Sequence, residues 1–338
     1  MHRMLHRVLI AALIGALAVG ITSLPGRAQS GGTTWKVLLG ADTPDHVLQG
    51  QDYYPRTITI NAGDSVTWTK NVALEHTVSF MSGARPPLPF SPQPDHRVLL
   101  NPLVAFPQGG PSYDGTGMAS SGVIQPAGKT YTLTFTKPGR YAYLCLLHPG
   151  MQGTVVVLGA GKPPMTQAQA DKAAAAQWAA ALAAGQRLRA SWKVASSASP
   201  SGPLYTASVV SDPQARISLF RFTPAPLRVK AGSTVTWRMK DVFEIHTVTF
   251  QGGGEVPQFL LLEQQPQGPP KLWFNPKVVA PAGGPAVTAN TYHNSGILFP
   301  VNPPGPTEYS LKFSKPGTYT YWCIVHVAEG MTGTIIVQ

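Results

Sequence analysis

Short stretches of alternating apolar and polar residues recur along the chain, and they predict β-strands. In residues 54–68, alternation on both sides of Ala62-Gly63 predicts two strands joined by a turn. Residues 226–237 repeat this pattern. Around residues 141–157, the pattern predicts a strand ending near Cys145, a short loop and a return strand. These segments predict an all-β fold.

One segment departs from this alternation and predicts a helix. Residues 166–188 are rich in alanine, with Thr166 placed to cap the start and Arg187 and Arg189 near the end. Its apolar residues recur every four positions, at Ala170, Ala174, Trp178 and Leu182. A stripe this narrow favours a helix that packs against one or both domains through Trp178. A recognition helix for another protein is the alternative.

The strand patterns occur in two copies, which predicts two domains within the 338 residues. Trp35-Lys-Val and Trp192-Lys-Val open the copies, and the insertions at 83–127 and 252–304 share Asn-Pro, Gly-Gly-Pro and Ser-Gly motifs. Gly and Pro are abundant, at 34 and 33 residues, as in loop-rich β-proteins. We expect a first domain at 29–159, a linker at 160–190 that becomes helical, and a second domain at 191–338. The insertions would shield a site, join the domains or dock a partner.

The N-terminus has the pattern of a secretory signal peptide, which we place at residues 1–28. Arg3 and Arg7 precede an apolar run, and Gly26-Arg27-Ala28 supplies small residues for cleavage. The pattern predicts a periplasmic or otherwise extracytoplasmic protein. An uncleaved membrane anchor is the alternative, because the apolar run from 8 to 24 approaches the length of a membrane span.

Each copy carries a thiolate, imidazoles and a thioether that together suit a metal. A trigonal site of one Cys and two His with a weak axial Met is the geometry of electron-transfer copper. Each loop supplies a Cys, a His and a Met, and a second His stands upstream in a His-Thr-Val motif. The predicted ligands are His76, Cys145, His148 and Met151 in the first copy, and His246, Cys323, His326 and Met331 in the second.

The sequence leaves other roles open for the predicted ligands. An exported chain with two cysteines suggests a Cys145–Cys323 disulfide, but such a bond would consume both sites. A catalytic Cys–His pair would need an orienting group, and the loops offer apolar neighbours instead. Zinc is a further alternative, although Met is a poor zinc ligand. Either Met would otherwise fill a gap in the core.

Both copies resemble blue copper proteins (cupredoxins) of the plastocyanin and amicyanin type. The first loop, Cys-x2-His-x2-Met, is similar to the amicyanin spacing, and the second, Cys-x2-His-x4-Met, to the plastocyanin spacing. The resemblance implies two Greek-key β-sandwich domains with one type 1 copper each. It also implies one-electron transfer between redox proteins, with the electron entering or leaving through His148 or His326.

The ligand set favours a carrier over an enzyme. A closed coordination sphere leaves no position for a substrate. In copper oxidases the resemblance would imply His residues flanking the Cys, but Leu144 and Leu146 flank Cys145, and the chain has no His-x-His pair. We therefore expect no enzymatic activity. Copper sequestration or delivery is the alternative function, and an assembly or sensor role is a third.

Charge adds a weaker expectation about partners. The net charge is +11, and removing Arg3, Arg7 and Arg27 leaves 23 basic and 15 acidic residues, or +8. A basic carrier would be steered toward an acidic redox partner or an anionic membrane surface. Because the basic residues are scattered, we expect no nucleic-acid binding. The sequence indicates no oligomeric state. His96 and His293 do not align between the copies, and we expect both at the surface.

Overall fold

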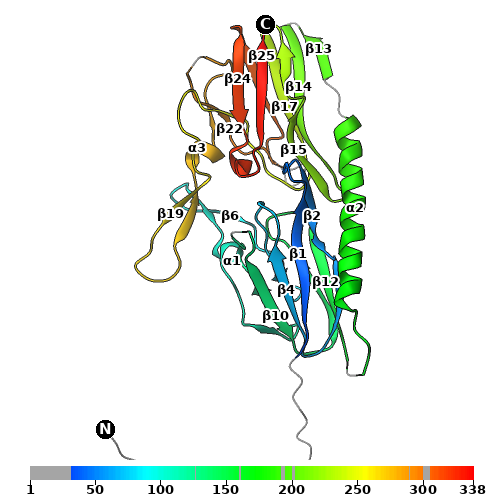
Figure 1. Cartoon of the computed structure of the whole chain (residues 1–338). Helices are drawn as coiled ribbons and strands as arrows, with labels where there is room; N and C mark the ends of the chain where they lie inside the picture. The colour runs from blue at the N-terminus through cyan, green and yellow to red at the C-terminus, as the bar shows by residue number, and fades with distance from the viewer. Residues whose placement is uncertain are drawn as a thin grey trace, which may run out of the picture. The chain divides into compact units, whose positions relative to one another are not determined.

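The computed structural model describes residues 32–125, 127–159, 161–191, 195–199, 202–288, 290–299 and 305–338. The predicted signal peptide and Trp192, the predicted opening of the second copy, lie outside these residues. The described chain is mostly β-strand, with two sandwich domains and one long helix (Figure 1). The predicted all-β class is therefore confirmed.

The first domain contains twelve described strands and one short helix. They are β1 (Thr34–Asp42), β2 (Leu48–Tyr54), β3 (Thr57–Asn61), β4 (Ser65–Lys70), β5 (Ser79–Phe80), β6 (Phe90–Pro92), β7 (Val98–Leu100), α1 (Pro102–Ala105), β8 (Ser112–Tyr113), β9 (Ala119–Ser120), β10 (Thr130–Phe135), β11 (Gly139–Leu144) and β12 (Gln152–Leu158). The predicted turn before β4 contains Gly63, whose φ of +94° suits glycine.

The long helix α2 (Gln167–Ser191) leads to the second domain, which repeats the order of strands. The elements of that domain are β13 (Ala195–Ser199), β14 (Gly202–Asp212), β15 (Ile217–Thr223), β16 (Leu227–Val229), β17 (Ser233–Lys240), β18 (Thr249–Phe250), β19 (Leu260–Glu263), β20 (Lys271–Phe274), α3 (Pro276–Val279), β21 (Pro281–Ala282), β22 (His293–Ser295), β23 (Glu308–Phe313), β24 (Gly317–Trp322), the 3-10 turn η1 (Ile324–His326) and β25 (Thr332–Val337).

The two domains share one continuous sheet. Its order is β23-β17-β14-β15-β2-β1-β4-β10-β8, with β13 paired to β14. The central pair, β15 and β2, is antiparallel and joins the domains, with Ile217 opposite Gly50 and Leu219 opposite Leu48. A second sheet completes each sandwich, β3-β12-β11-β5-β9 in the first domain and β16-β25-β24-β18-β22-β21 in the second. The duplication thus reappears strand by strand.

Equivalent aromatic residues fill the two cores. Trp68 and Trp237, from β4 and β17, are buried at the centre of their domains. Each indole meets a tyrosine edge-on, Tyr143 at 5.3 Å and Tyr321 at 5.2 Å between ring centroids. These tyrosines lie on β11 and β24, the strands that end directly before Cys145 and Cys323, so the packing of each core positions its cysteine.

Helix α2 begins with the predicted cap and packs across the joint between the domains. The Thr166 hydroxyl accepts from the Gln169 amide, and the Gln169 side chain accepts from the Thr166 amide, which forms a capping box. Trp178 and Leu182, with the buried Ala181 of the same helix, pack against residues from both domains: Val47 and Leu48 of the first and Val210, Ile217 and Leu219 of the second. The prediction that the helix packs within the chain is confirmed. No helix in the described part of the chain combines the length and apolarity needed to cross a membrane.

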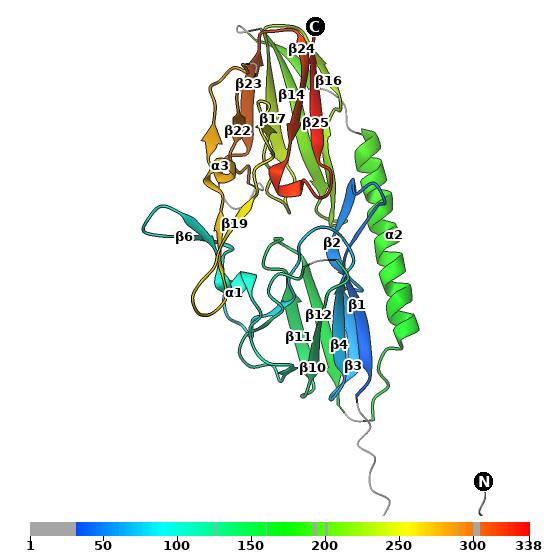
Figure 2. The ribbon, with the colours of Figure 1, turned by 60° about the vertical axis from the view of Figure 1, so that its left-hand side comes forward.

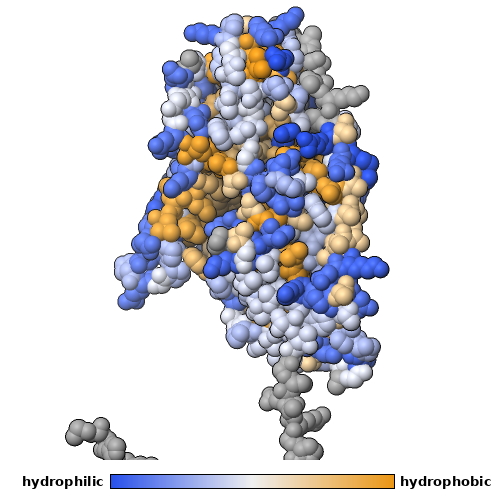
Figure 3. Space-filling model, viewed as in Figure 1, coloured by the Kyte–Doolittle hydropathy of each residue, from blue (hydrophilic) through white to orange (hydrophobic). Residues whose placement is uncertain are grey.

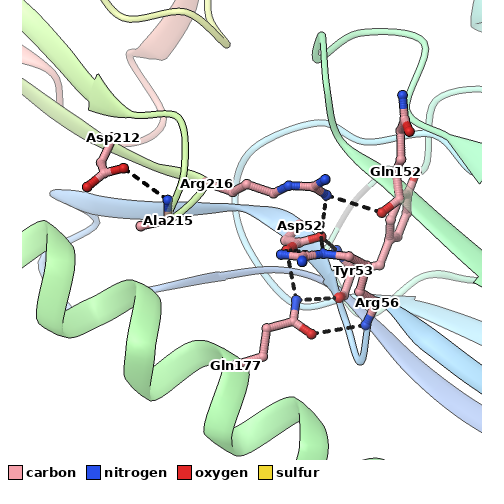
Figure 4. Close-up of polar contacts among 8 residues, drawn as sticks. All are labelled: Asp52, Tyr53, Arg56, Gln152, Gln177, Asp212, Ala215 and Arg216. Atoms are coloured by element: carbon pink, nitrogen blue, oxygen red, sulfur yellow. Dashed lines mark hydrogen bonds and ion pairs between the residues drawn. The ribbon is translucent and has the colours of Figure 1, made fainter.

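A buried carboxylate ties the first domain, the second domain and α2 together (Figure 4). Asp52 on β2 pairs with Arg56 and accepts from Arg216 of the second domain at 3.1 Å and from Gln177 of α2 at 2.8 Å. The Arg216 guanidinium also donates to the Gln152 carbonyl. Three segments distant in sequence therefore meet on one side chain.

The two insertions form a small sheet of their own, in the order β19-β20-β7-β6. Trp273 of β20 pairs with Leu99 of β7, and the Arg97 guanidinium lies 3.8 Å from the centre of the Trp273 ring. Figure 2 shows these hairpins on the side of the molecule away from α2. Of the three roles considered for the insertions, contact between the domains is the one that this sheet supports.

We expect Asp52→Ala to lower the free energy of unfolding by about 2–3 kcal/mol, because it leaves Arg56 and Arg216 without their shared partner. The value lies below that of a fully buried ion pair, because both guanidinium groups keep contact with water. Denaturant unfolding measures it. Asp95→Ala, which breaks an exposed pair with Arg97, is the control and should leave the stability nearly unchanged, because solvent screens that pair. Equal losses of stability in the two variants would show that the Asp52 contacts stabilise the protein no more than an exposed ion pair does.

Candidate metal centres

The first candidate site lies at one end of the first sandwich. Cys145 directly follows β11, and His148 and Met151 lie in the loop before β12. His76 comes from the segment between β4 and β5, where it bridges to Ile124. The Cys145 amide donates to the Met151 carbonyl at 3.0 Å, which closes the loop onto the site. The structure therefore brings His76, Cys145 and His148 together, and Met151 lies in the same loop as Cys145 and His148.

Two imidazoles and the thiol of this site face one another. The Nδ1 atoms of His76 and His148 lie 3.0 Å apart, and Cys145 Sγ lies 3.4 Å from His148 Nδ1. All three side chains are buried, and their donor atoms lie within 4.8 Å of one another. Met151 is fully buried at the end of the loop.

The second site repeats this arrangement. The Nδ1 atoms of His246 and His326 lie 3.2 Å apart, and Cys323 Sγ lies 3.4 Å from His326 Nδ1 and 3.6 Å from His246 Nδ1. Met331 is buried, and its amide donates to the His326 carbonyl at 3.1 Å. His246 bridges to Leu298 as His76 bridges to Ile124.

The donor sets fit a bound metal. Nitrogen and thiolate ligands lie roughly 2.0–2.3 Å from the ion, so donors that share one ion lie within roughly 4.6 Å of one another. The Nδ1–Nδ1 distances of 3.0 and 3.2 Å and the Sγ–Nδ1 distances of 3.4 Å in the first set and 3.4 and 3.6 Å in the second meet this condition. Both cysteines are free and buried, so the disulfide considered above is not formed.

Comparison with known proteins agrees with this geometry. The model for copper-binding proteins of the plastocyanin/azurin family matches residues 45–158 and 210–338, once for each domain. The chain belongs to this family. Its two sandwiches are thus cupredoxin domains, as the loop spacings predicted.

Individual relatives match about one domain's worth of the chain. A plastocyanin from Synechococcus sp. is 28% identical over 157 residues, 46% of this chain and 93% of that protein. Amicyanin-alpha from Methylorubrum extorquens is 29% identical over 143 residues, 42% of this chain and 85% of that protein. A chloroplastic plastocyanin from Tetradesmus obliquus is 32% identical over 123 residues, 36% of this chain and 65% of that protein. A solved structure of an amicyanin mutant in the Cu(I) form covers 37% of this chain and 82% of its own, at 23% identity and a TM-score of 0.24.

A threonine after the upstream His supports each cysteine of the cupredoxin domains. The Thr77 amide donates to Cys145 Sγ at 3.4 Å, and its hydroxyl accepts from the Leu146 amide at 2.7 Å. Thr247 makes the same two contacts, with Cys323 and the Ile324 amide. Sequence reasoning missed this role, although the repeated His-Thr-Val motif contained the signal.

Charge in the metal-free sites favours thiolates. Burial alone would raise the thiol pKa of Cys145, but the neighbouring His148 and His76 outweigh it and hold that pKa well below its ordinary value. Burial likewise opposes ionisation of Cys323, and His326 and His246 lower its pKa well below the usual value. The thiolate is the form that ligates metals.

The loop histidines of the two domains meet at one carboxylate. Glu244 Oε1 lies 3.0 Å from His148 Nε2, and Glu244 Oε2 lies 3.6 Å from His326 Nε2. All three side chains are at most 5% exposed. The Oε1 atom lies outside the hydrogen-bond cone of the His148 ring, so the contact is an ion pair without an aligned hydrogen bond. Burial raises the pKa of Glu244, but the charge of His148 and contact with His326 outweigh this and lower it.

This placement bears on the expected route through His148 or His326. Both rings are buried, with Nδ1 toward the candidate site and Nε2 toward Glu244. A path through Nε2 of either ring therefore leads to Glu244, which contacts a His from each domain. Sequence reasoning missed Glu244, although a glutamate shortly precedes the upstream His in both copies, at Glu75 and Glu244.

The upstream histidines have different surroundings. His246 Nε2 lies 3.4 Å from a buried carboxylate oxygen of Asp241. His76 Nε2 is buried without a hydrogen-bond partner and packs against Gly40, where an added Cβ would come within 2.8 Å of it. The pKa values follow this difference. Burial lowers the pKa of His76, whereas for His246 the contacts with Asp241 and Cys323 together outweigh burial and raise the pKa.

One expectation about histidines is wrong. His293 is buried and not at the surface, because it lies in β22 opposite Phe250, under the loop at Gly283. Gly283 leaves the room that the ring occupies, since a Cβ there would lie 2.3 Å from His293 Nδ1. His96 is exposed, as expected.

A pocket of about 820 Å³ opens beside the loop histidines and Glu244. Residues from both loops and both insertions line it, among them Leu88, Phe90, Leu147, Phe243, Phe274 and Phe299. Figure 3 shows apolar residues gathered around a hollow on the side where α3 and β19 lie. The space beside the His148 and His326 rings is therefore lined largely by apolar side chains.

We expect Thr77→Val to lower the free energy of unfolding of the metal-free protein by about 1–3 kcal/mol, because the buried Leu146 amide loses its acceptor. Denaturant unfolding measures it. The matched control is Thr67→Val, which removes a more exposed hydroxyl pair with Thr132 and should change stability by less than about 0.5 kcal/mol. A Thr77→Val protein as stable as the control variant would contradict the supporting role of Thr77.

Proposed function

We propose that this chain is an exported blue copper protein that carries single electrons between redox partners through one type 1 copper in each of two domains, 29–159 and 191–338. The observation that carries the proposal is the pair of buried His/Cys/His sets, each within 4.8 Å, in a copper-binding family. The proposed ligands are His76, Cys145, His148 and Met151, and His246, Cys323, His326 and Met331. The Met sulfurs are the axial ligands in this proposal.

The residues of each site support electron transfer without substrate chemistry. Bound copper supplies a one-electron couple. The sandwich strands hold the Cys and both His rings in buried positions, so the ligands have little room to rearrange when the charge changes. Thr77 and Thr247 direct amides at the sulfurs, which stabilises thiolate charge. A carrier requires no open ligand position, and this chain acts as a carrier in our proposal.

The same proposal includes where the protein acts and which partners it meets. The signal-like segment 1–28 would direct export, and the excess of basic residues would steer the carrier toward acidic redox proteins. Copper sequestration or delivery is the competing function. It requires exchangeable copper, whereas the buried sets favour copper that stays in place.

The first test counts copper and records the visible and electron paramagnetic resonance spectra. We expect two coppers per chain and intense thiolate charge-transfer absorption, because each set holds a buried thiolate. Cys145→Ser and Cys323→Ser should each remove about half of this absorption. A colourless protein, or a single copper, would refute the two-site carrier. Copper that a Cu(I) chelator removes quickly would favour sequestration or delivery.

A second test concerns the difference between the sites. Asp241→Asn removes a negative charge beside His246, which weakens binding of Cu(II) more than of Cu(I). A tenfold loss of affinity for Cu(II) relative to Cu(I), the lower end for changes to a group that contacts a metal ligand, corresponds to a rise of roughly 60 mV in the reduction potential of the second site. Potentiometry of the Cys145→Ser background, which isolates that site, measures it.

The matched control replaces a buried aspartate that touches no ligand. Asp64 bonds to Trp35 and to backbone amides near the β3–β4 turn, so Asp64→Asn should leave both potentials unchanged. An unchanged potential in Asp241→Asn would show that its carboxylate does not act on the second site.

A further inference from the structure

Glu244 stands where the two candidate sites approach each other. It follows β17 of the second domain, yet its nearest ion-pair contact is with His148 of the first domain, at 3.0 Å, and its other oxygen faces His326 at 3.6 Å. Phe243 and the apolar pocket lie around it, and its side chain is 5% exposed. A carboxylate in such surroundings is stable only with cationic or hydrogen-bonding partners, and the two rings supply them.

The orientation of the rings gives this carboxylate a role toward both sites. Each loop His turns Nδ1 to its own Cys and Nε2 to Glu244. A ligating His generally donates its second ring N–H to an outer acceptor, which fixes the ring and raises its basicity. Here the oxygens of one carboxylate lie beside the second ring nitrogen of a His from each domain, at ion-pair distance. The two ligand sets are thus linked by three side chains, in the order His148, Glu244, His326.

The glutamate before the upstream His of the first domain does not share this placement. Glu75 also precedes an upstream His, but it pairs with Lys70 at 3.0 Å, and its side chain is 37% exposed. The second copy has one more residue, Ile245, between the glutamate and the ligand His. Only Glu244 of this pair contacts the loop histidines.

We propose that Glu244 couples the two metal sites, so that an electron passes from one ligand set to the other along His148, Glu244 and His326. This inference rests on the proposed function. The step oxidises one site by one electron and reduces the other by one. No covalent bond breaks, and the Nε2 protons stay on the rings. The chain is then an internal relay that accepts an electron at one domain and releases it from the other.

The experiment uses the full copper-loaded chain and pulsed reduction of less than one electron per molecule. The wild type should show a phase of exchange between the sites whose rate does not depend on protein concentration. Cys145→Ser and Cys323→Ser provide the spectrum of each single site. In Glu244→Gln this phase should slow by about tenfold or more, the size of effect expected when a charge-assisted contact is lost. Glu75→Gln, the matched control, should keep the wild-type rate.

A second readout does not depend on electron transfer. In the fully reduced Cu(I) protein, which is diamagnetic, the Nε2–H resonances of His148 and His326 should both shift in Glu244→Gln and stay in place in Glu75→Gln. A carboxylate that lies beside both rings predicts that one substitution moves resonances in both domains. Should Glu244→Gln fold poorly, Glu244→Asp keeps the charge but shortens the side chain, and it should slow exchange with both coppers retained.

The outcomes distinguish failure of the relay through Glu244 from failure of the proposed carrier function. Fewer than two thiolate-bound coppers in the wild type would refute the carrier and the relay together. Two coppers with an exchange rate that Glu244→Gln and Glu244→Asp leave unchanged would refute the relay alone, and Glu244 would then be an ion pair that holds the domains together. Slower exchange with two coppers retained and both resonances shifted would establish the coupling.

Discussion

The pairing of β2 with β15 is the constraint on which the rest of the structure depends. Each strand would otherwise be a free edge of its own sandwich, with unpaired backbone groups. Joined, they make one sheet that crosses both domains and fixes their relative orientation. Helix α2 and Asp52 reinforce the same joint. Because the joint is rigid, the loops at the ends of the two sandwiches face each other at a defined separation, and Glu244 reaches a ring from each.

Buried groups of opposite charge lie beside one another near the two sites. Thiolates at Cys145 and Cys323 and carboxylates at Asp241 and Glu244 stand against the histidines of the two sets. Isolated charges at such depth would be prohibitively costly, whereas charges with partners are tolerated. The two sites differ in the groups that contact the upstream histidines, His76 and His246. One upstream His has a carboxylate behind it and the other has only Gly40, so two similar ligand sets occupy different electrostatic surroundings.

The sequence carried most of the information within each domain and little of that between them. The strands, the turn at Gly63 and the grouping of Cys145 with His148 follow from local patterns, and the duplication repeated each signal. The roles of Glu244 and Asp241 depend on contacts across the fold, which alternation and spacing do not encode. The same holds for the β2–β15 pairing. His293 was misplaced because its burial depends on the room that the distant Gly283 leaves.

The small sheet built from the two insertions has a consequence for dividing the chain into its halves. Each domain contributes two strands to it, and the contact of Arg97 with Trp273 spans the two halves. Either half alone would carry a two-stranded hairpin with an unpaired edge, and such a hairpin is marginally stable in water. The duplicated halves therefore do not behave as two separable modules, although each has a core of its own.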